Sequence, residues 1–192
     1  MSSLTLKKLA FRGAAWTILG YGFGQSLRLG SNLILTRLLV PELFGLMALV
    51  NTFIMGLTLF SDIGIGPNII QNRRGDDQVF LNTAWTIQIL RGFGIWVVCL
   101  MITFPVAQIY QEPRLLWLIP VVSFNAVIHG FNATSLFTLK RHLKFAQLTI
   151  LEVVKQIVTL IVMIVWACFS RTIWAIVGGL LIGSLVKMVW SH

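Results

Sequence analysis

The chain has 192 residues, of which 57% are hydrophobic and only 11% are charged. About a quarter of the residues in an ordinary soluble domain are charged, so this composition excludes a soluble globular domain and favours a membrane protein. The net charge of +9 does not predict a nucleic-acid partner, because the cations lie in small groups between apolar runs and form no basic face.

Apolar runs of bilayer length predict an all-α polytopic membrane protein with one bundle of six transmembrane helices. A spanning helix needs about 20 mostly apolar residues. Runs of this kind fall at residues 11–39, 44–65, 79–109, 115–139, 145–169 and 173–190. The connectors are short and carry Pro, Gly or charged residues, so we expect a single transmembrane lobe over residues 1–192 without an extramembrane domain.

The distribution of cations among the connectors predicts the orientation of the spans. Alternate connectors and helix ends group the following cations on one side: Lys7, Lys8, Arg12, Arg73, Arg74, Lys140, Arg141, Lys144 and Lys187. The other side receives Arg37, Arg114 and Arg171. Because Lys and Arg accumulate on the cytoplasmic side, we expect both termini to be cytoplasmic.

Polar residues recur along one face of nearly every predicted span. In the first span they are spaced by three and four residues, which places them on one side of an α-helix. Uncompensated polar groups are costly in hydrocarbon, so such a face is expected to line a bundle interior or a water-filled cavity. The candidate substrate-binding residues on these faces are Gln25, Arg28, Asn32, Asn51, Gln88, Arg91, Asn125 and Asn132.

Arg28 and Arg91 are the most informative of these residues, because both fall near the middle of a predicted span. A guanidinium there is costly, and intramembrane charges usually have a function. One interpretation is that both line a central cavity and bind an anion, most naturally phosphate, whose oxygens match the guanidinium fork. The alternative is that each pairs with a carboxylate or with backbone carbonyls of a neighbouring helix and only fixes packing.

Possible ion-coupling residues are Asp62, Glu152 and Lys155. Asp62 falls near the inner end of its predicted helix, where it could instead make capping contacts. Glu152 and Lys155 are three residues apart and could simply neutralise each other. His129 is expected to be a satisfied hydrogen-bonding group rather than a proton relay.

Nothing in the sequence predicts a metal site or a cofactor. Cys99 and Cys168 both lie in apolar stretches, lack CxxC spacing and have no clustered His or acidic residues beside them, so both are expected to pack as small apolar residues. The chain contains no GxxxxGK[ST] phosphate-binding loop, so we expect no ATP hydrolysis through such a motif.

Several motifs resemble one family of transporters. They include the TRLLVPELFG turn at residues 36–45, the SDIGIG segment at residues 61–66, GAAW at 13–16, NTAW at 82–85 and YQEP at 110–113. In these motifs the chain resembles the polysaccharide-transporter branch of the multidrug/oligosaccharidyl-lipid/polysaccharide flippase superfamily, which includes Wzx-type flippases. The resemblance extends over essentially the whole chain.

This resemblance implies a bacterial inner-membrane protein that is not an enzyme. Its expected substrate is an undecaprenyl-pyrophosphate-linked oligosaccharide, moved across the bilayer during exopolysaccharide, capsule or O-antigen synthesis. The expected partners are that substrate, membrane lipids, and a second lobe or the polysaccharide polymerase machinery.

Members of this family have two six-helix lobes that alternate access to a cationic cavity. The present chain matches the N-terminal lobe alone, so we expect a fragment of a longer protein that is inactive by itself, or otherwise a half-transporter that needs a partner. The alternative functions are a cation-coupled drug exporter of the same superfamily and a membrane enzyme of polysaccharide assembly.

Overall fold

The computed structural model describes residues 3–62, 64–72, 75 and 77–192, with side chains from residue 18 onward in these ranges. The described residues form α-helices and no strands, which confirms the predicted all-α class. The helices are α1 (Ser3–Leu38), α2 (Pro41–Phe60), α3 (Ile65–Gln71), α4 (Gln78–Ile109), α5 (Leu115–Gly130), α6 (Ser135–Arg141), α7 (Phe145–Phe169) and α8 (Trp174–Ser191).

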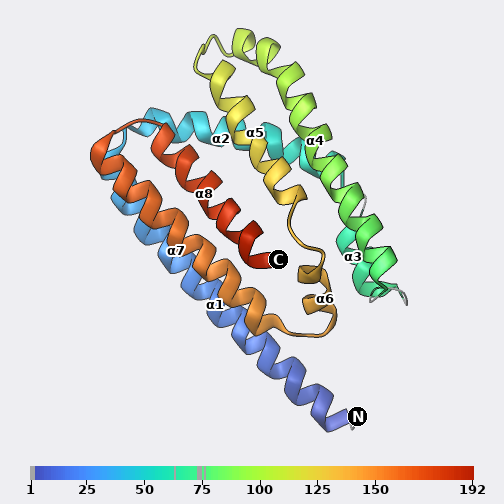
Figure 1. Ribbon diagram of the computed structural model, residues 1–192. Coiled ribbons are helices and arrows are strands. Elements are labelled where there is room, and N and C mark those ends of the chain that lie inside the picture. The colour runs from blue at the N-terminus through green and yellow to red at the C-terminus, as the bar shows by residue number, and fades with distance from the viewer. Residues whose placement is uncertain (1–2, 63, 73–74, 76) are drawn as a thin grey trace.

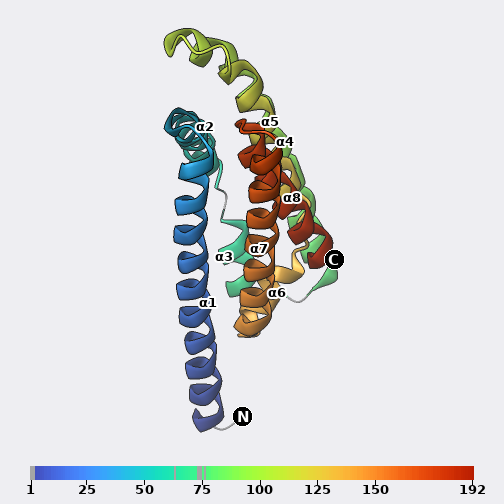
Figure 2. The same ribbon diagram turned by 90° about the vertical axis from the view of Figure 1, so that its left-hand side faces the viewer.

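The long helices form two groups that meet at α5. Helices α1, α7 and α8 lie side by side, and α4 pairs with α5 (Figure 1). α5 also packs against α8 and so connects the two groups. α2 runs across the bundle near the α7–α8 connector, and Figure 2 looks along its axis. The N-terminus, α3 and α6 lie at the opposite end of the molecule (Figure 1).

Local sequence explains where two of these helices begin. α2 starts at Pro41, whose fixed φ suits the first helical position, and Glu42 in the same turn complements the positive end of the helix dipole. α4 starts after Asp77, whose side chain accepts a hydrogen bond from the backbone N–H of Val79 at 3.1 Å. An Asp at this position satisfies one of the backbone donors that a helix start leaves unpaired.

The hydrophobic core is centred on α5. Leu115, Leu118 and Ile119 on this helix are fully buried and belong to one cluster with Cys99 of α4 and Val177 of α8. Cys99 thus packs as a small apolar residue, as the sequence predicts. This core joins α4, α5 and α8.

Glycines allow two of the helix pairs to pack closely. A β-carbon at Gly92 of α4 would lie 2.6 Å from the carbonyl oxygen of Ala126 in α5, and one at Gly130 would lie 3.0 Å from the carbonyl oxygen of Gln88. Gly20 and Gly24 of α1 likewise face α7 side chains at short range. Small residues at these positions let the backbones approach, which is how helices commonly associate in membranes.

Two predicted spans differ from the structure. The predicted helix at 115–139 is wrong as a continuous helix, because α5 ends at Gly130 and α6 resumes at Ser135 with a bend of 61°. The predicted helix at 44–65 ends early, at Phe60. Gly64 then adopts a left-handed φ of 69°, accessible at little cost only to glycine, and leads into the separate helix α3.

The number of membrane spans is only partly fixed by these helices. Among the described residues, four helices are long and apolar enough to cross a bilayer: α2, α4, α7 and α8. The bent pair α5 and α6 supplies a fifth if it counts as one broken span. α1 is the longest helix, but polar residues such as Gln25, Arg28 and Asn32 interrupt its apolar sequence. Six spans therefore remains a prediction, while the membrane-spanning character is clear.

Candidate functional site

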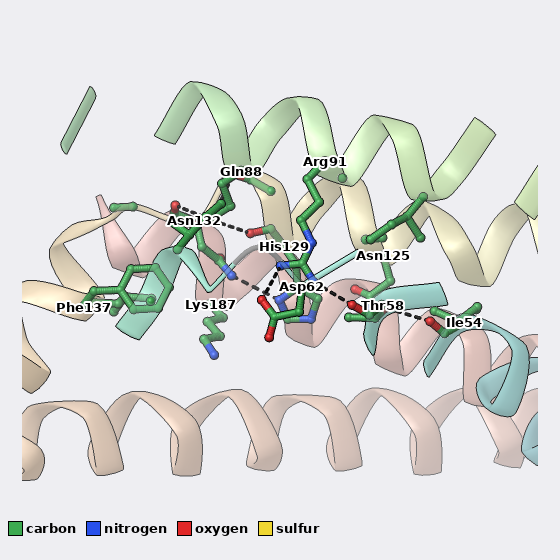
Figure 3. Close-up of a pocket in the computed structure, with 18 of the residues that line it drawn as sticks. Ile54, Thr58, Asp62, Gln88, Arg91, Asn125, His129, Asn132, Phe137 and Lys187 are labelled. Atoms are coloured by element: carbon green, nitrogen blue, oxygen red, sulfur yellow. Dashed lines mark hydrogen bonds and ion pairs between the residues drawn. The ribbon is translucent and has the colours of Figure 1, made fainter. Parts of the chain in front are cut away.

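A pocket of about 510 Å³ lies between the α4–α5 pair and the α7–α8 pair (Figure 3). The C-terminal end of α2 and residues of α3 and α6 complete its wall. Its polar and charged lining residues are Asn51, Thr58, Asp62, Gln88, Arg91, Asn125, His129, Asn132, Lys140, Glu152 and Lys187. The pocket therefore collects polar side chains inside a bundle whose outer surface is strongly apolar.

Arg91 reaches from α4 to the C-terminal end of α2 (Figure 3). Its Nε donates to Ser61 Oγ at 3.1 Å, and one terminal nitrogen donates to the carbonyl of Thr58 at 2.7 Å. The other terminal nitrogen lies 3.5 Å from Asp62 Oδ1. Because the carbonyls at a helix end carry partial negative charge, the guanidinium stabilises the end of α2. A guanidinium has five N–H donors, so these contacts still leave donors for a ligand.

Glu152 and Lys187 form a second ion pair on the other side of the pocket, between α7 and α8. The expected pairing of Glu152 with Lys155 is corrected here, because Lys187 is the residue that contacts the carboxylate. Lys155 does not line the pocket. Sequence spacing within α7 could not reveal Lys187, because that residue comes from another helix.

Side chains from α4 and from the residue after α8 hold the break between α5 and α6. The Gln88 side-chain amide lies 3.0 Å from the carbonyl oxygen of His129, 3.2 Å from that of Gly130 and 3.2 Å from that of Asn132. His192 Nε2 lies 3.0 Å from the carbonyl oxygen of Phe131. Irregular backbone is tolerated at membrane depth only where its polar groups find such partners or line a cavity. Gln88 thus stabilises the break.

Two amide oxygens of the pocket are buried without a hydrogen-bond partner among the described residues, Asn125 Oδ1 and Asn132 Oδ1. The Asn132 side-chain nitrogen, by contrast, lies 3.1 Å from His129 Nδ1 and donates to it. A buried acceptor without a partner is costly. Donors such as sugar hydroxyls would satisfy these two oxygens.

The remaining candidates divide between the pocket and an exposed surface. Asn51 and Asp62 line the pocket. Gln25, Arg28 and Asn32 are instead exposed on α1, and none of them lines the pocket. The structure therefore brings Arg91, but not Arg28, together with the amides of α4 and α5.

The pocket contains several polar groups that the sequence interpretation did not select. Thr58 accepts a hydrogen bond from Arg91, and Lys140 and Lys187 add cations, while Ser61, which also binds Arg91, lies outside the pocket lining. Thr58 follows Asn51 by seven residues and precedes Asp62 by four, so helical spacing places it on the same face, whereas Ser61 enters the sequence interpretation only as part of the SDIGIG segment. Within the described ranges, His, Cys, Asp and Glu form no group of three that could hold a metal ion.

Comparisons with known proteins agree on one family. Residues 34–192 match the model of a family described as polysaccharide biosynthesis protein. Over 184 residues the chain is 19% identical to the succinoglycan biosynthesis transport protein ExoT of Rhizobium meliloti (strain 1021). This alignment covers 94% of the chain and 36% of that relative, so the chain spans about a third of the length of the curated protein it matches. No solved structure matches the chain.

Proposed function

Because the chain belongs to the polysaccharide biosynthesis protein family, we propose that it forms one lobe of a transporter for a lipid-linked oligosaccharide. The proposed substrate is a sugar chain attached through pyrophosphate to a polyprenyl lipid. The oligosaccharide and the pyrophosphate enter the pocket, and the lipid tail stays in the bilayer. Transport itself requires a second lobe that moves against this one.

The observation that carries the proposal is the composition of the pocket. It joins the cationic groups of Arg91, Lys140 and Lys187 to amide oxygens that find no partner among the described residues, inside a bundle with an apolar exterior. Guanidinium and ammonium groups bind phosphate oxygens. Amide oxygens accept hydrogen bonds from hydroxyl groups, which sugars supply. A substrate with both chemistries and a lipid tail fits these features together.

The proposed orientation has both termini in the cytoplasm of a bacterial inner membrane. Lys140, Arg141 and Lys144 lie at or just after α6, at the end of the molecule that also holds the start of α1 (Figure 1). Arg37, in the last turn of α1, and Arg114, directly before α5, belong to the other end of the molecule. The larger group of cations supports a cytoplasmic position for the α6 end.

In this proposal the exposed polar face of α1 lines the cavity between the two lobes. Gln25, Arg28 and Asn32 are exposed on that face, where an uncovered polar stripe would be costly in lipid. Arg28 then provides a cation on the path between the lobes.

Binding to the chain in nanodiscs of neutral lipid tests the proposal. The probe is a short polyprenyl-pyrophosphate-linked disaccharide, and the matched control probe is the same disaccharide on the same polyprenol without phosphate. We expect the pyrophosphate probe to bind at least about tenfold more tightly, and Arg91→Gln to remove most of that preference. Arg91→Lys controls for folding, because it keeps a cation at the end of α2. Equal binding of the two probes by the wild-type chain would contradict the proposal.

A further inference from the structure

The two ion pairs of the pocket share one pattern of exposure. The side chains of Arg91 and Lys187 are only 19% and 15% exposed, whereas those of Asp62 and Glu152 are 58% and 54% exposed. In each pair the cation is largely covered by protein and the carboxylate is half open. The carboxylates are therefore the members of both pairs that protein atoms hold less closely.

Arg91 does not depend on Asp62 for its position. The hydrogen bonds to Ser61 Oγ and to the Thr58 carbonyl hold the guanidinium at the end of α2. The contact to Asp62 is longer, at 3.5 Å, and Asp62 Oδ1 also accepts from the backbone N–H of Gly64 at 3.1 Å. Asp62 can leave the guanidinium while both side chains keep other partners.

Glu152 has a second cation within reach on its own helix. Lys155 follows it by three residues on α7, a spacing that brings side chains together on one helix face. Glu152 can therefore pass from Lys187 to Lys155. That change would free the ammonium group of Lys187 inside the pocket.

From this geometry we propose that a phosphate-bearing ligand binds by exchange, with Lys187 as a second phosphate ligand beside Arg91. The inference rests on the proposed function and adds how the charges of the two cations are balanced before a ligand binds. Asp62 and Glu152 act as resident counter-ions that balance the two cations while no ligand is bound. Phosphate oxygens then replace both carboxylates, and Glu152 moves to Lys155.

The physical reason for such counter-ions is the cost of isolated charges. A covered cation without a partner carries a large desolvation penalty, which a nearby carboxylate offsets. A ligand with two phosphate groups carries negative charge at two positions. It can therefore pair with both Arg91 and Lys187, which lie on opposite sides of the pocket. A ligand without phosphate offers no such replacement and leaves the pairs intact.

Two substitutions with opposite expected effects test the exchange. The probe is inorganic pyrophosphate, titrated into the full chain in nanodiscs of neutral lipid. We expect Glu152→Gln to tighten binding by about three- to tenfold, because Lys187 loses its competitor. Lys187→Gln is expected to weaken binding by about tenfold or more, and the double variant to behave like Lys187→Gln. Lys144→Gln, which removes a cation outside the pocket, is the matched control and is expected to change nothing.

If the Glu152–Lys187 pair only held α7 and α8 together, the two substitutions would change pyrophosphate binding in the same direction. Glu152→Gln and Lys187→Gln would then lower both thermal stability and pyrophosphate affinity, and this result would overturn the exchange while leaving the proposed function standing. Wild-type protein that binds no pyrophosphate would overturn both. Opposite changes in affinity, with both variants still folded by circular dichroism, would support the exchange.

Discussion

A β-carbon at Gly92 is expected to force α4 and α5 apart. It would lie 2.6 Å from the Ala126 carbonyl oxygen and 3.3 Å from Val127 Cα. These are backbone atoms, which cannot swing aside as the end of a flexible side chain can. Two residues later, a β-carbon at Gly94 would meet nothing within 4 Å. Gly94→Ala therefore makes the same chemical change on the same helix without the clash.

The expected cost follows from comparing the two variants. Ala favours a helix over Gly by up to about 1 kcal/mol in both, so the difference between Gly92→Ala and Gly94→Ala removes this contribution. Overpacking a tight contact typically costs about 1 to 3 kcal/mol. We therefore expect Gly92→Ala to be less stable than Gly94→Ala by about 1 to 3 kcal/mol.

Reversible denaturation in mixed detergent micelles, followed by far-ultraviolet circular dichroism, measures this difference. Because Gly92 also lines the pocket, Gly92→Ala is expected to weaken pyrophosphate binding, whereas Gly94→Ala keeps it. Equal stability of the two variants would refute the close approach of α4 and α5.

Two further predictions concern side chains that hold irregular backbone. Gln88→Met keeps the length of the side chain but removes its N–H donors from the three carbonyls at the end of α5, so we expect it to cost about 1 to 3 kcal/mol of unfolding free energy. Gln25→Met on the exposed face of α1 is the control in the same denaturation assay, and an equal cost in both variants would contradict the assigned contacts. Arg141 donates to carbonyls at the end of α3, so Arg141→Met is expected to speed amide hydrogen exchange in residues 65–71. Lys144→Met is its control, and unchanged exchange in Arg141→Met would show that α3 is held by other contacts.

Sequence periodicity predicted which residues share a helix face, but not which helix that face meets. Asn125 and Asn132 were placed on one polar side, and both line the pocket. The break near Asn132 was missed because the apolar run continues past it, and its carbonyls are satisfied by residues distant in sequence. Lys187 was missed as the partner of Glu152 for the same reason, since the two come from different helices. Long-range pairing of this kind depends on packing, which local spacing does not encode.

The direct test of the lipid-linked oligosaccharide proposal is a photo-crosslink from the pocket wall. Benzoylphenylalanine in place of Asn125 would face the pocket, and the same group in place of Leu29, which is 66% exposed on α1, would lie outside it. With a radiolabelled polyprenyl-pyrophosphate-linked oligosaccharide, we expect labelling from position 125 that excess pyrophosphate suppresses. Labelling from position 29 is expected to be weak and insensitive to pyrophosphate. Equal labelling from both positions, unaffected by pyrophosphate, would contradict a pocket that binds the phosphate end of the substrate.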